Sequence, residues 1–380
     1  MLIRPPRLVL LDTSHLTGLA ADHSSADPTR RQAAQSFRST LIAAGWLMLL
    51  SWHQLEELIQ HRDDELVDRR LQFLRDMPML AWVSPFDSNS GPGSVIDILA
   101  TEASAAQSHP EVDVMGVRDL ARAHLISFGP GDAAVHEGFR DWRLLREALQ
   151  ERQERTRRTA AISPWRAANI GNTLIGDWLK QPLRDPADAT RILNRLRNDL
   201  ADEITRRGDK RIADPEAMAN EFFAEVIGDG SAVATSDNDS PALQFLLNFG
   251  LDLDDIDPAA TFDETMDKVV FLRRLRVISE AYGLPLGELR RAVSQSRLPV
   301  TVIEYAIRRY GQDQPERKGS DLNDAHLLCL APYADVTYVD KRTLESVRRA
   351  RPKDPTFSRL VGKVEKAANY REIGAALARQ

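Results

Sequence analysis

The sequence has a single cysteine, Cys329, and no long apolar run among its 380 residues. One thiol cannot form an internal disulfide, and it suits a reducing compartment. No segment approaches the roughly 18 consecutive apolar residues of a membrane-spanning helix. The first apolar run, residues 8–11, is shorter than the core of a secretory signal, which needs about 7–15 apolar residues. These absences predict a soluble, cytoplasmic protein without a membrane partner.

Several motifs with defined chemistry are also missing. The sequence contains no glycine-rich phosphate loop, no paired Cys/His zinc spacing and no Gly-x-Ser-x-Gly nucleophile elbow. The stretch LDLDDIDP lacks the glycine and the final glutamate of a calcium-binding loop. The formal net charge is -6, which gives no general affinity for nucleic acid. A nucleic-acid partner would therefore need a local basic surface.

The N-terminal part of the chain alternates between strand-like and helix-like segments. Three short apolar runs are typical of buried parallel strands, and they cover residues 7–11, 46–50 and 79–83. A polar turn at 12–14 follows the first run. Apolar residues at helical spacing predict helices over residues 30–44, 52–61 and 65–75. This order predicts an α/β fold with a Rossmann-like parallel sheet and crossover helices.

The character of the sequence changes after Ser84. The turn-rich segment PFDSNSGPGS is followed by residues that read almost entirely as helix up to about Arg309, with no predicted strand. Strand character returns only at the β-branched and aromatic run Val336–Val339. We therefore expect an α/β domain interrupted by a large helical insertion. The predicted boundaries are 1–84 for the first part of the α/β domain, 85–317 for the insertion or second domain, and 318–380 for the second part.

Aspartates stand at the ends of two predicted strands. Asp12 follows the first strand, and Asp340 follows the strand at 336–339. Asp321 and Asp324 lie three residues apart at the start of a helix, so both carboxylates share one helical face. Ligands gather at the carboxyl ends of parallel strands, and carboxylates hold Mg²⁺ or Mn²⁺. The pattern predicts an acidic metal site.

The order of these acids resembles that of the PIN-domain nucleases, metal-dependent ribonucleases with a Rossmann-like sheet. The resemblance rests on VLLDTS, QLEEL, LNDAHLLCLA and DVTYVDK, and it covers roughly residues 7–84 and 318–350. It implies a catalytic site that binds Mg²⁺ or Mn²⁺ through matching acids. These are Asp12, Glu57 (with Glu56 as the alternative), Asp324 and Asp340, with Asp321 as a further metal ligand. Val339 stands where the family has a threonine or serine, and Thr337 lies two residues earlier.

The resemblance implies a hydrolase that cleaves phosphodiester bonds, most readily those of RNA. Bound cations stabilise charge on the attacking and leaving oxygens of such a reaction. The Val339 departure and the overall acidity leave an alternative open, in which an inactive PIN-like module serves as a scaffold for protein or nucleic acid. A third interpretation concerns biological role and makes the protein a toxin or phage-defence effector nuclease. In the nuclease, the helical insertion would form or gate the substrate groove, whereas in the scaffold it would be the interaction surface.

Residues 140–166 are the predicted nucleic-acid contact. They hold eight arginines and four acids, a net charge of +4, with Trp142 and Trp165 available for stacking on bases. The competing interpretation is a solvated helix whose arginines pair with acids one turn away. The arginines assigned to phosphate contacts are Arg152, Arg155, Arg157 and Arg158, together with Arg342 beside Asp340.

Two further segments carry weaker signals. Arg118 and His124 have the spacing found in the all-helical HEPN ribonucleases, although their helix has an apolar face that makes them surface residues instead. Residues 229–267 contain ten acids and neither lysine nor arginine. This acidic region is expected to repel nucleic acid or to bind a basic protein partner.

Overall fold

The computed structural model describes residues 5–88, 91–136, 139, 141–162, 171–180, 186–230, 243, 246–247, 249–312 and 316–380. The chain divides into two compact units. Unit 1 comprises Met1–Gln153, Gly287–Asp313 and Leu322–Gln380. Unit 2 comprises Glu154–Leu286 and Gln314–Asp321.

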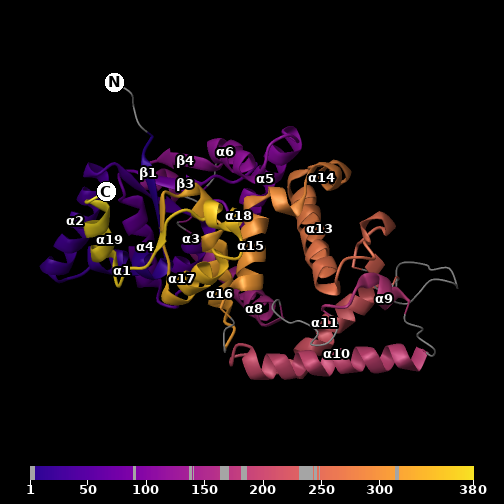
Figure 1. Cartoon of the computed structure of the whole chain (residues 1–380). Helices are drawn as coiled ribbons and strands as arrows, with labels where there is room; N and C mark the ends of the chain where they lie inside the picture. Colours follow the sequence, from indigo (N-terminus) through magenta and orange to yellow (C-terminus); the bar gives the residue numbers. More distant parts are fainter. Residues whose placement is uncertain are drawn as a thin grey trace. The chain divides into compact units, whose positions relative to one another are not determined.

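Unit 1 is built on one sheet of six strands in the order β4-β3-β2-β1-β5-β6 (Figure 1). All neighbouring strands pair in parallel except β3 and β4, which are antiparallel. The predicted α/β class with a mostly parallel sheet is thus confirmed. The strands are β1 (Arg7–Leu11), β2 (Trp46–Leu50), β3 (Leu80–Val83), β4 (Ile126–Gly129), β5 (Val336–Tyr338) and β6 (Val364–Glu365).

The centre of the sheet is β1, which pairs with β2 on one side and with β5 on the other. Val9 aligns with Met48 of β2 and with Val336 of β5. From β1 the chain first builds β2 and β3 on one side and only much later returns to build β5 and β6 on the opposite side. The strand order therefore reverses between β1 and β5, which is the position where open α/β sheets bind their ligands.

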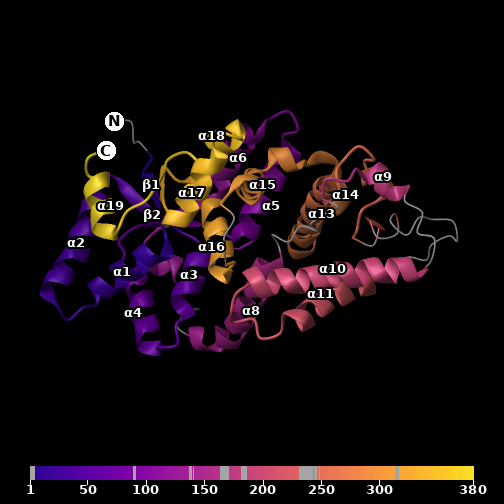
Figure 2. The same ribbon diagram turned by 60° about the horizontal axis from the view of Figure 1, so that its bottom comes forward.

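Both faces of the sheet are covered by helices (Figure 2). Val9 and Leu11 belong to an apolar cluster with residues of the helices on one face, while Leu8 and Leu10 are equally buried on the other face. The first group of helices is α1 (Thr13–His23), α2 (Pro28–Ala43), α3 (Trp52–Ile59), α4 (Asp64–Arg75) and α19 (Tyr370–Leu377). The second group, whose members pack on one another, is α5 (Val95–Ser108), α6 (Val114–Leu125), α15 (Pro299–Tyr310), α17 (Lys341–Ala350) and α18 (Pro355–Leu360).

Two local predictions need correction. The residues after β1 do not form a turn, because Asp12 caps a full helix, α1, that starts at Thr13. Residues 126–129 form strand β4, within the region where the sequence predicted no strand. This strand is only four residues long and lies at the sheet edge with Phe128 exposed, so it lacks the continuous apolar run of a buried strand.

The packing of unit 1 also extends beyond the predicted α/β segments. Residues 85–153 and 287–313, which the sequence places in the insertion, are part of the unit that contains the sheet. They include β4, which completes the sheet edge, and a helix pair, α5 and α6, that packs with α15. The remaining elements that fall wholly or partly in this unit are α7 (Gly131–Ala134), η2 (Trp142–Leu145), α8 (Arg146–Ile162), α14 (Leu286–Ala292), η4 (Gln295–Arg297), α16 (Gly319–Leu328) and η5 (Ala331–Tyr333).

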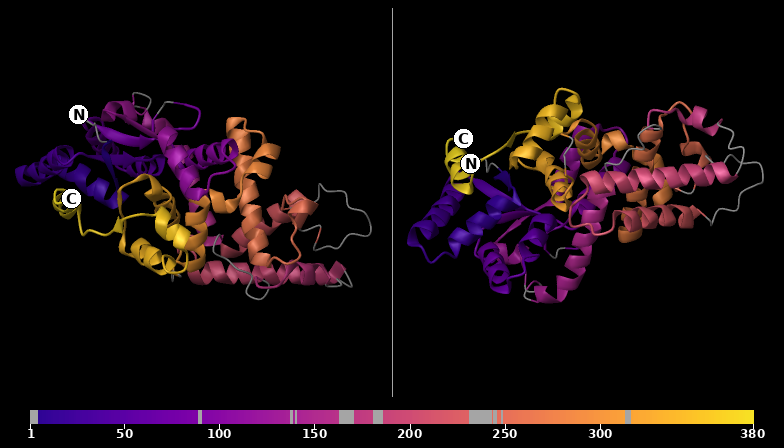
Figure 3. Two further views of the ribbon diagram at one scale, coloured as in Figure 1. Left: turned by 45° about the horizontal axis from the view of Figure 1, so that its top comes forward. Right: turned by 90° about the horizontal axis from the view of Figure 1, so that it is seen from below.

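Unit 2 is helical in the part of the chain that the structure describes. Its long helices α10 and α11 lie side by side (Figures 1 and 3) and share a small apolar core with the end of α8, including Leu200, Ala219 and Ala161. The mainly helical character that the sequence predicts for this part of the chain is confirmed among the described residues. The elements are α9 (Ile175–Leu179), α10 (Pro186–Arg207), α11 (Pro215–Gly230), η3 (Leu253–Asp255) and α13 (Phe262–Tyr282).

A buried aspartate attaches the C-terminal helix to the first helices of the chain. Asp22 of α1 accepts hydrogen bonds from the Tyr370 hydroxyl at 2.6 Å, from Arg371 at 2.8 Å and from Arg30 at 2.6 Å. Burial alone would raise the pKa of Asp22, but these three donors outweigh it and lower the pKa. The ionised carboxylate therefore joins α19 to α1 and α2.

We expect Asp22→Asn to loosen α19. The neutral amide keeps the shape but loses the charge-assisted bonds, so the free energy of unfolding should fall by about 1–3 kcal/mol at pH 7. Because the folded-state pKa is lowered, the contribution is present above the unfolded pKa and disappears as the pH falls through the folded value. Hydrogen exchange of α19 amides measures the effect, with Asp76→Asn at an exposed position as the control. Unchanged exchange in α19 would contradict this role.

Candidate active site

Asp12 and Asp340 lie at the carboxyl ends of two paired central strands. Asp12 directly follows β1, and its backbone N–H donates to the carbonyl of Tyr338, the last residue of β5, at 2.9 Å. Asp340 comes two residues after Tyr338. The chain then leaves β1 through α1 on one face of the sheet and β5 through α17 in the other group of helices. Both aspartates thus flank the point where the strand order reverses.

Each of these aspartates also begins a helix. Oδ1 of Asp12 accepts the backbone N–H of Ser14 at 2.7 Å, and Oδ1 of Asp340 accepts that of Thr343 at 2.6 Å. These are N-cap contacts, which aspartate forms readily. Within the described residues, Oδ2 of both carboxylates has no hydrogen-bond partner, so one oxygen on each remains available for a cation.

Helix α3 connects the end of β1 to Glu57. Gln54 donates to the carbonyl of Leu11 at 2.7 Å and also accepts the Ser51 backbone N–H at 2.9 Å, which completes a capping box. Ser51 is therefore the N-cap of α3. Glu57 lies one turn beyond Gln54, half-buried, and its Oε1 accepts the side-chain amide of Asn323 from α16 at 2.6 Å.

A pair of stacked histidines joins α3 to α16 beside this contact. The rings of His53 and His326 have centroids 4.5 Å apart. Burial, followed by the positive charge of Arg152, lowers the pKa of His53 to about 4, so its ring is neutral at pH 7. Its Nε2 accepts the N–H of Val95 at 3.2 Å, which places the proton on Nδ1. The sequence pattern does not predict this pair, because His53 lies just before QLEEL and only His326 lies within a motif, LNDAHLLCLA.

Glu56 and Glu57 have different surroundings, and this difference favours Glu57 as the site residue. Glu56 is 5% exposed and lies 3.2 Å from Nε of Arg152 on α8. Burial raises the pKa of Glu56 against the opposing effect of Arg152. Glu56 is therefore committed to an internal ion pair, whereas Glu57 is accessible.

The helix that carries Asn323 also carries the remaining predicted ligands. Asp324 is half-buried on α16, next to the residue that contacts Glu57. Asp321 falls in unit 2, and its Oδ2 accepts the N–H of Lys318 at 2.8 Å. In the part of the chain that the structure describes, no three His, Cys, Asp or Glu side chains form a group that could hold a metal.

The donor set at the strand ends suits a weakly held Mg²⁺ or Mn²⁺. Mg²⁺ retains several waters and commonly needs only one or two protein carboxylates. Asp12 and Asp340 supply hard oxygen donors of this kind, and Glu57 adds a third acid one turn along α3. A three-ligand cage is not a requirement for such an ion, so the residues fit a site with two carboxylate ligands.

Most of the arginines predicted to contact nucleic acid pair with acids. Arg152 pairs with Glu56, Arg157 with Glu154 and Asp209, and Arg158 with Glu221. Arg155 lies exposed on α8, and Arg342 lies exposed on α17. These ion pairs favour the competing interpretation of α8, in which its arginines pair with acids of the same protein instead of contacting nucleic acid.

The tryptophan proposed for base stacking is not accessible. Trp142 is 1% exposed, and its ring nitrogen donates to Asp68 at 2.9 Å. Arg143 and Arg146 lie over its ring and pair with Asp64. The expected stacking by Trp142 is therefore wrong, since a core position cannot bind a base, and Trp165 lies outside the described residues.

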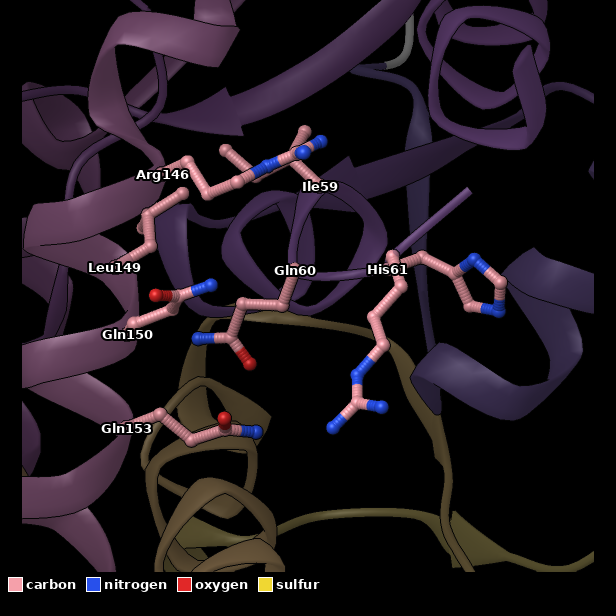
Figure 4. A pocket seen from close by; sticks show the side chains of 8 residues that line it. Ile59, Gln60, His61, Arg146, Leu149, Gln150 and Gln153 are labelled. Carbon is pink, nitrogen blue, oxygen red and sulfur yellow. The ribbon is translucent and has the colours of Figure 1, made fainter. Parts of the chain in front are cut away.

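A small polar pocket of about 80 Å³ opens where the end of α3 meets α8. Figure 4 shows the amide groups of Gln60, Gln150 and Gln153 on one side of this pocket, with the His61 ring directed away from them. Gln60 also donates to Glu56 at 3.3 Å. The pocket therefore adjoins the Glu56–Arg152 ion pair.

The spacing of Arg118 and His124 and the acidic region 229–267 are the two weaker signals of the sequence, and neither is developed into a candidate site. Arg118 on α6 pairs with its neighbour Asp119 at 2.6 Å, and His124 is exposed at the end of the same helix. Of the acidic region 229–267, residues 231–242, 244–245 and 248 lie outside the described residues. Its described part includes an ion pair between Asp255 and Lys268 at 3.1 Å. The basic protein partner stays a prediction.

Comparison with known proteins gave no match to a family model, to a curated protein or to a solved structure. The interpretation of the site therefore depends on the residues of this chain alone. Among the described residues, no helix has the length and apolar character needed to cross a membrane.

Proposed function

We propose that this protein is a divalent-metal-dependent nuclease that acts on RNA. The observation that carries the proposal is the position of Asp12 and Asp340 at the ends of the paired strands β1 and β5, where the strand order reverses. In open α/β sheets this position is where ligands bind. The contact between Glu57 and Asn323 brings a further acid-bearing pair of helices, α3 and α16, together in the same unit.

The chemistry of these residues suits phosphodiester hydrolysis. A cation bound there would neutralise charge on the reacting phosphate and activate a water molecule. Asp12 and Asp340 would hold the ion through their second carboxylate oxygens. Glu57 and Asp324 would orient the waters around the ion or bind it directly.

Cleavage of end-labelled single-stranded RNA and DNA tests the proposal. We expect wild-type protein to cut RNA with Mn²⁺ or Mg²⁺ and to be inactive in EDTA. Cleavage of DNA alone would correct the substrate class. Cleavage that persists in EDTA, or no cleavage of either polymer with either cation, would contradict the proposal.

A second candidate function is an inactive module that serves as a scaffold. It is favoured by the capping role of both aspartates and by the absence, among the described residues, of a three-ligand group. Metal binding separates the two functions, because a ligand that binds only the folded state stabilises it.

For an active site, we expect millimolar Mn²⁺ to raise the melting temperature by several degrees. A concentration 100 times the Kd adds about 2.7 kcal/mol to the free energy of unfolding. The shift should disappear in EDTA and should be small in Asp340→Asn. An equal shift in wild type and Asp340→Asn would place the bound ion elsewhere, and no shift in wild type would favour the scaffold.

A further inference from the structure

One segment after the candidate site differs in charge from the rest of the chain. Residues 341–366 hold nine lysines and arginines and three acids, a net charge of +6, while the whole chain has a net charge of -6. We call residues 341–366 the basic segment. It begins directly after Asp340 and comprises α17, α18 and β6. A strongly positive segment therefore lies directly after the end of β5, although the net charge of the chain is negative.

The cations of the basic segment are exposed and mostly unpaired. In the described part of the chain, ion pairs within the segment are limited to Arg349 with Glu345 and Lys363 with Glu365. Six exposed cations have no ion pair among the described residues: Lys341, Arg342, Arg348, Lys353, Arg359 and Lys366. The α8 arginines that pair with Glu56, Glu154 and Glu221 differ in this respect.

The geometry of α17 places four cations on one side. Its buried residues Ser346, Val347 and Ala350 face the protein, and α17 packs against α15. Lys341 and Arg348, like Arg342 and Arg349, are seven residues apart and therefore lie on the same helical face two turns apart. Asp340 is the N-cap of this helix, so the basic face starts at the candidate active site.

The composition of the segment favours nucleic acid over a lipid surface. A helix that lies on a membrane inserts large apolar side chains between the lipids. Among the described residues, every exposed large hydrophobic side chain lies outside residues 341–366. Unpaired lysines and arginines without apolar neighbours match the phosphate backbone, whose binding releases counterions.

We propose that the outer face of α17, with Lys341, Arg342 and Arg348 as its unpaired cations, binds the phosphate backbone of a nucleic acid and directs it to Asp12 and Asp340. The link to these two aspartates rests on the proposed function. Binding itself does not, because it requires no metal. Phosphate contacts of this kind position a strand without reading its sequence.

Binding of fluorescein-labelled single-stranded RNA, single-stranded DNA and duplex DNA in EDTA tests the proposal. The variant is Lys341→Gln/Arg342→Gln/Arg348→Gln, measured by anisotropy from 50 to 200 mM salt. We expect at least about tenfold weaker binding at 50 mM salt. The plot of log affinity against log salt should become shallower by up to about 2 for single strands, because three phosphate contacts are lost.

The matched control removes three exposed arginines elsewhere in unit 1: Arg69, Arg291 and Arg379. The variant Arg69→Gln/Arg291→Gln/Arg379→Gln has the same net charge as the test variant, so equal losses would show a non-local effect and overturn the proposal. Circular dichroism shows whether the test variant is folded. If it is not, Arg342→Gln alone should make the plot of log affinity against log salt shallower by the amount expected for the loss of about one phosphate contact.

Three other outcomes are decisive. Wild-type protein that binds none of the polymers at 50 mM salt overturns the proposal, as does binding to vesicles of phosphatidylserine and phosphatidylcholine without binding to nucleic acid. If metal-dependent cleavage is the same in the test variant as in wild type, the proposed role of α17 is contradicted and the nuclease function is supported. Binding that is lost in the test variant, with no cleavage by wild type, supports the basic face and contradicts the nuclease.

Discussion

Asp12→Asn should cut RNA at least 100-fold more slowly than wild type while keeping its fold. The asparagine Oδ1 can still accept the Ser14 N–H, so the N-cap of α1 is retained. The substitution removes the negative charge that would hold the cation. Substitutions in the shell around metal ligands already cost about 10–100-fold in affinity or activity, and a ligand itself should cost more. The measurement is single-turnover cleavage at saturating Mn²⁺.

Asp113→Asn is a matched control for this prediction. Asp113 is the N-cap of α6, and its Oδ1 accepts the N–H of Gly116 at 2.9 Å, so it caps a helix as Asp12 does. Both variants should have the same circular dichroism spectrum as wild type, and Asp113→Asn should cleave at the wild-type rate. Wild-type cleavage by Asp12→Asn would show that the site is wrong.

Glu102→Gln should remove a large part of the pH dependence of stability. Glu102 on α5 is completely buried, and it accepts the hydroxyl of Tyr333 at 2.6 Å and the N–H of Val300, the second residue of α15, at 3.0 Å. Burial, opposed by these two donors, raises the pKa of Glu102 to about 8. The carboxyl group is therefore mostly protonated at pH 7 in the folded protein.

The sign of the effect follows from the raised pKa. Below the unfolded value of about 4.5 both states are protonated, and the contribution of Glu102 is fully present. As the pH rises towards 8, the unfolded state releases the proton while the folded state retains it. The contribution of Glu102 to the free energy of unfolding then falls by about 1 kcal/mol per pH unit.

Urea unfolding at pH 5, 6, 7 and 8 measures this loss. The difference between Glu102→Gln and wild type should change by several kcal/mol in favour of the glutamine as the pH rises. Glu111→Gln, at an exposed position, provides the control and should follow wild type. If the free energy of unfolding varies with pH in the same way for Glu102→Gln and wild type, the buried carboxyl group is ionised and this prediction is wrong.

The α/β part of the fold was predictable from local patterns. The apolar runs at β1 and β2 are strands with the predicted bounds, and four of the five residues in each are buried, because a strand covered on both faces is largely apolar. The same local pattern predicts that Asp12 and Asp340 follow the ends of strands. The relation between the two strands is a long-range contact, and the pattern of either strand alone does not specify it.

Other features depended on partners far away in the sequence. Arg152 and Glu56 are 96 positions apart, so helix periodicity could not show that they pair. Trp142 was predicted to be available for stacking on bases, but Arg143 and Arg146 lie over its ring. In the basic segment the charges are close in sequence, so the local pattern is sufficient to predict the exposed face.

The position of β5 in the sheet has a consequence for synthesis on the ribosome. Leu8 of β1 donates to the carboxylate of Asp335, which immediately precedes β5 and lies 327 residues later. At about 5–20 residues per second, one edge of the central strand waits roughly 15–65 s for its neighbour. An apolar strand with an open edge is a template for aggregation during that time. We therefore expect nascent chains that end before Val336 to depend strongly on chaperones that bind β1.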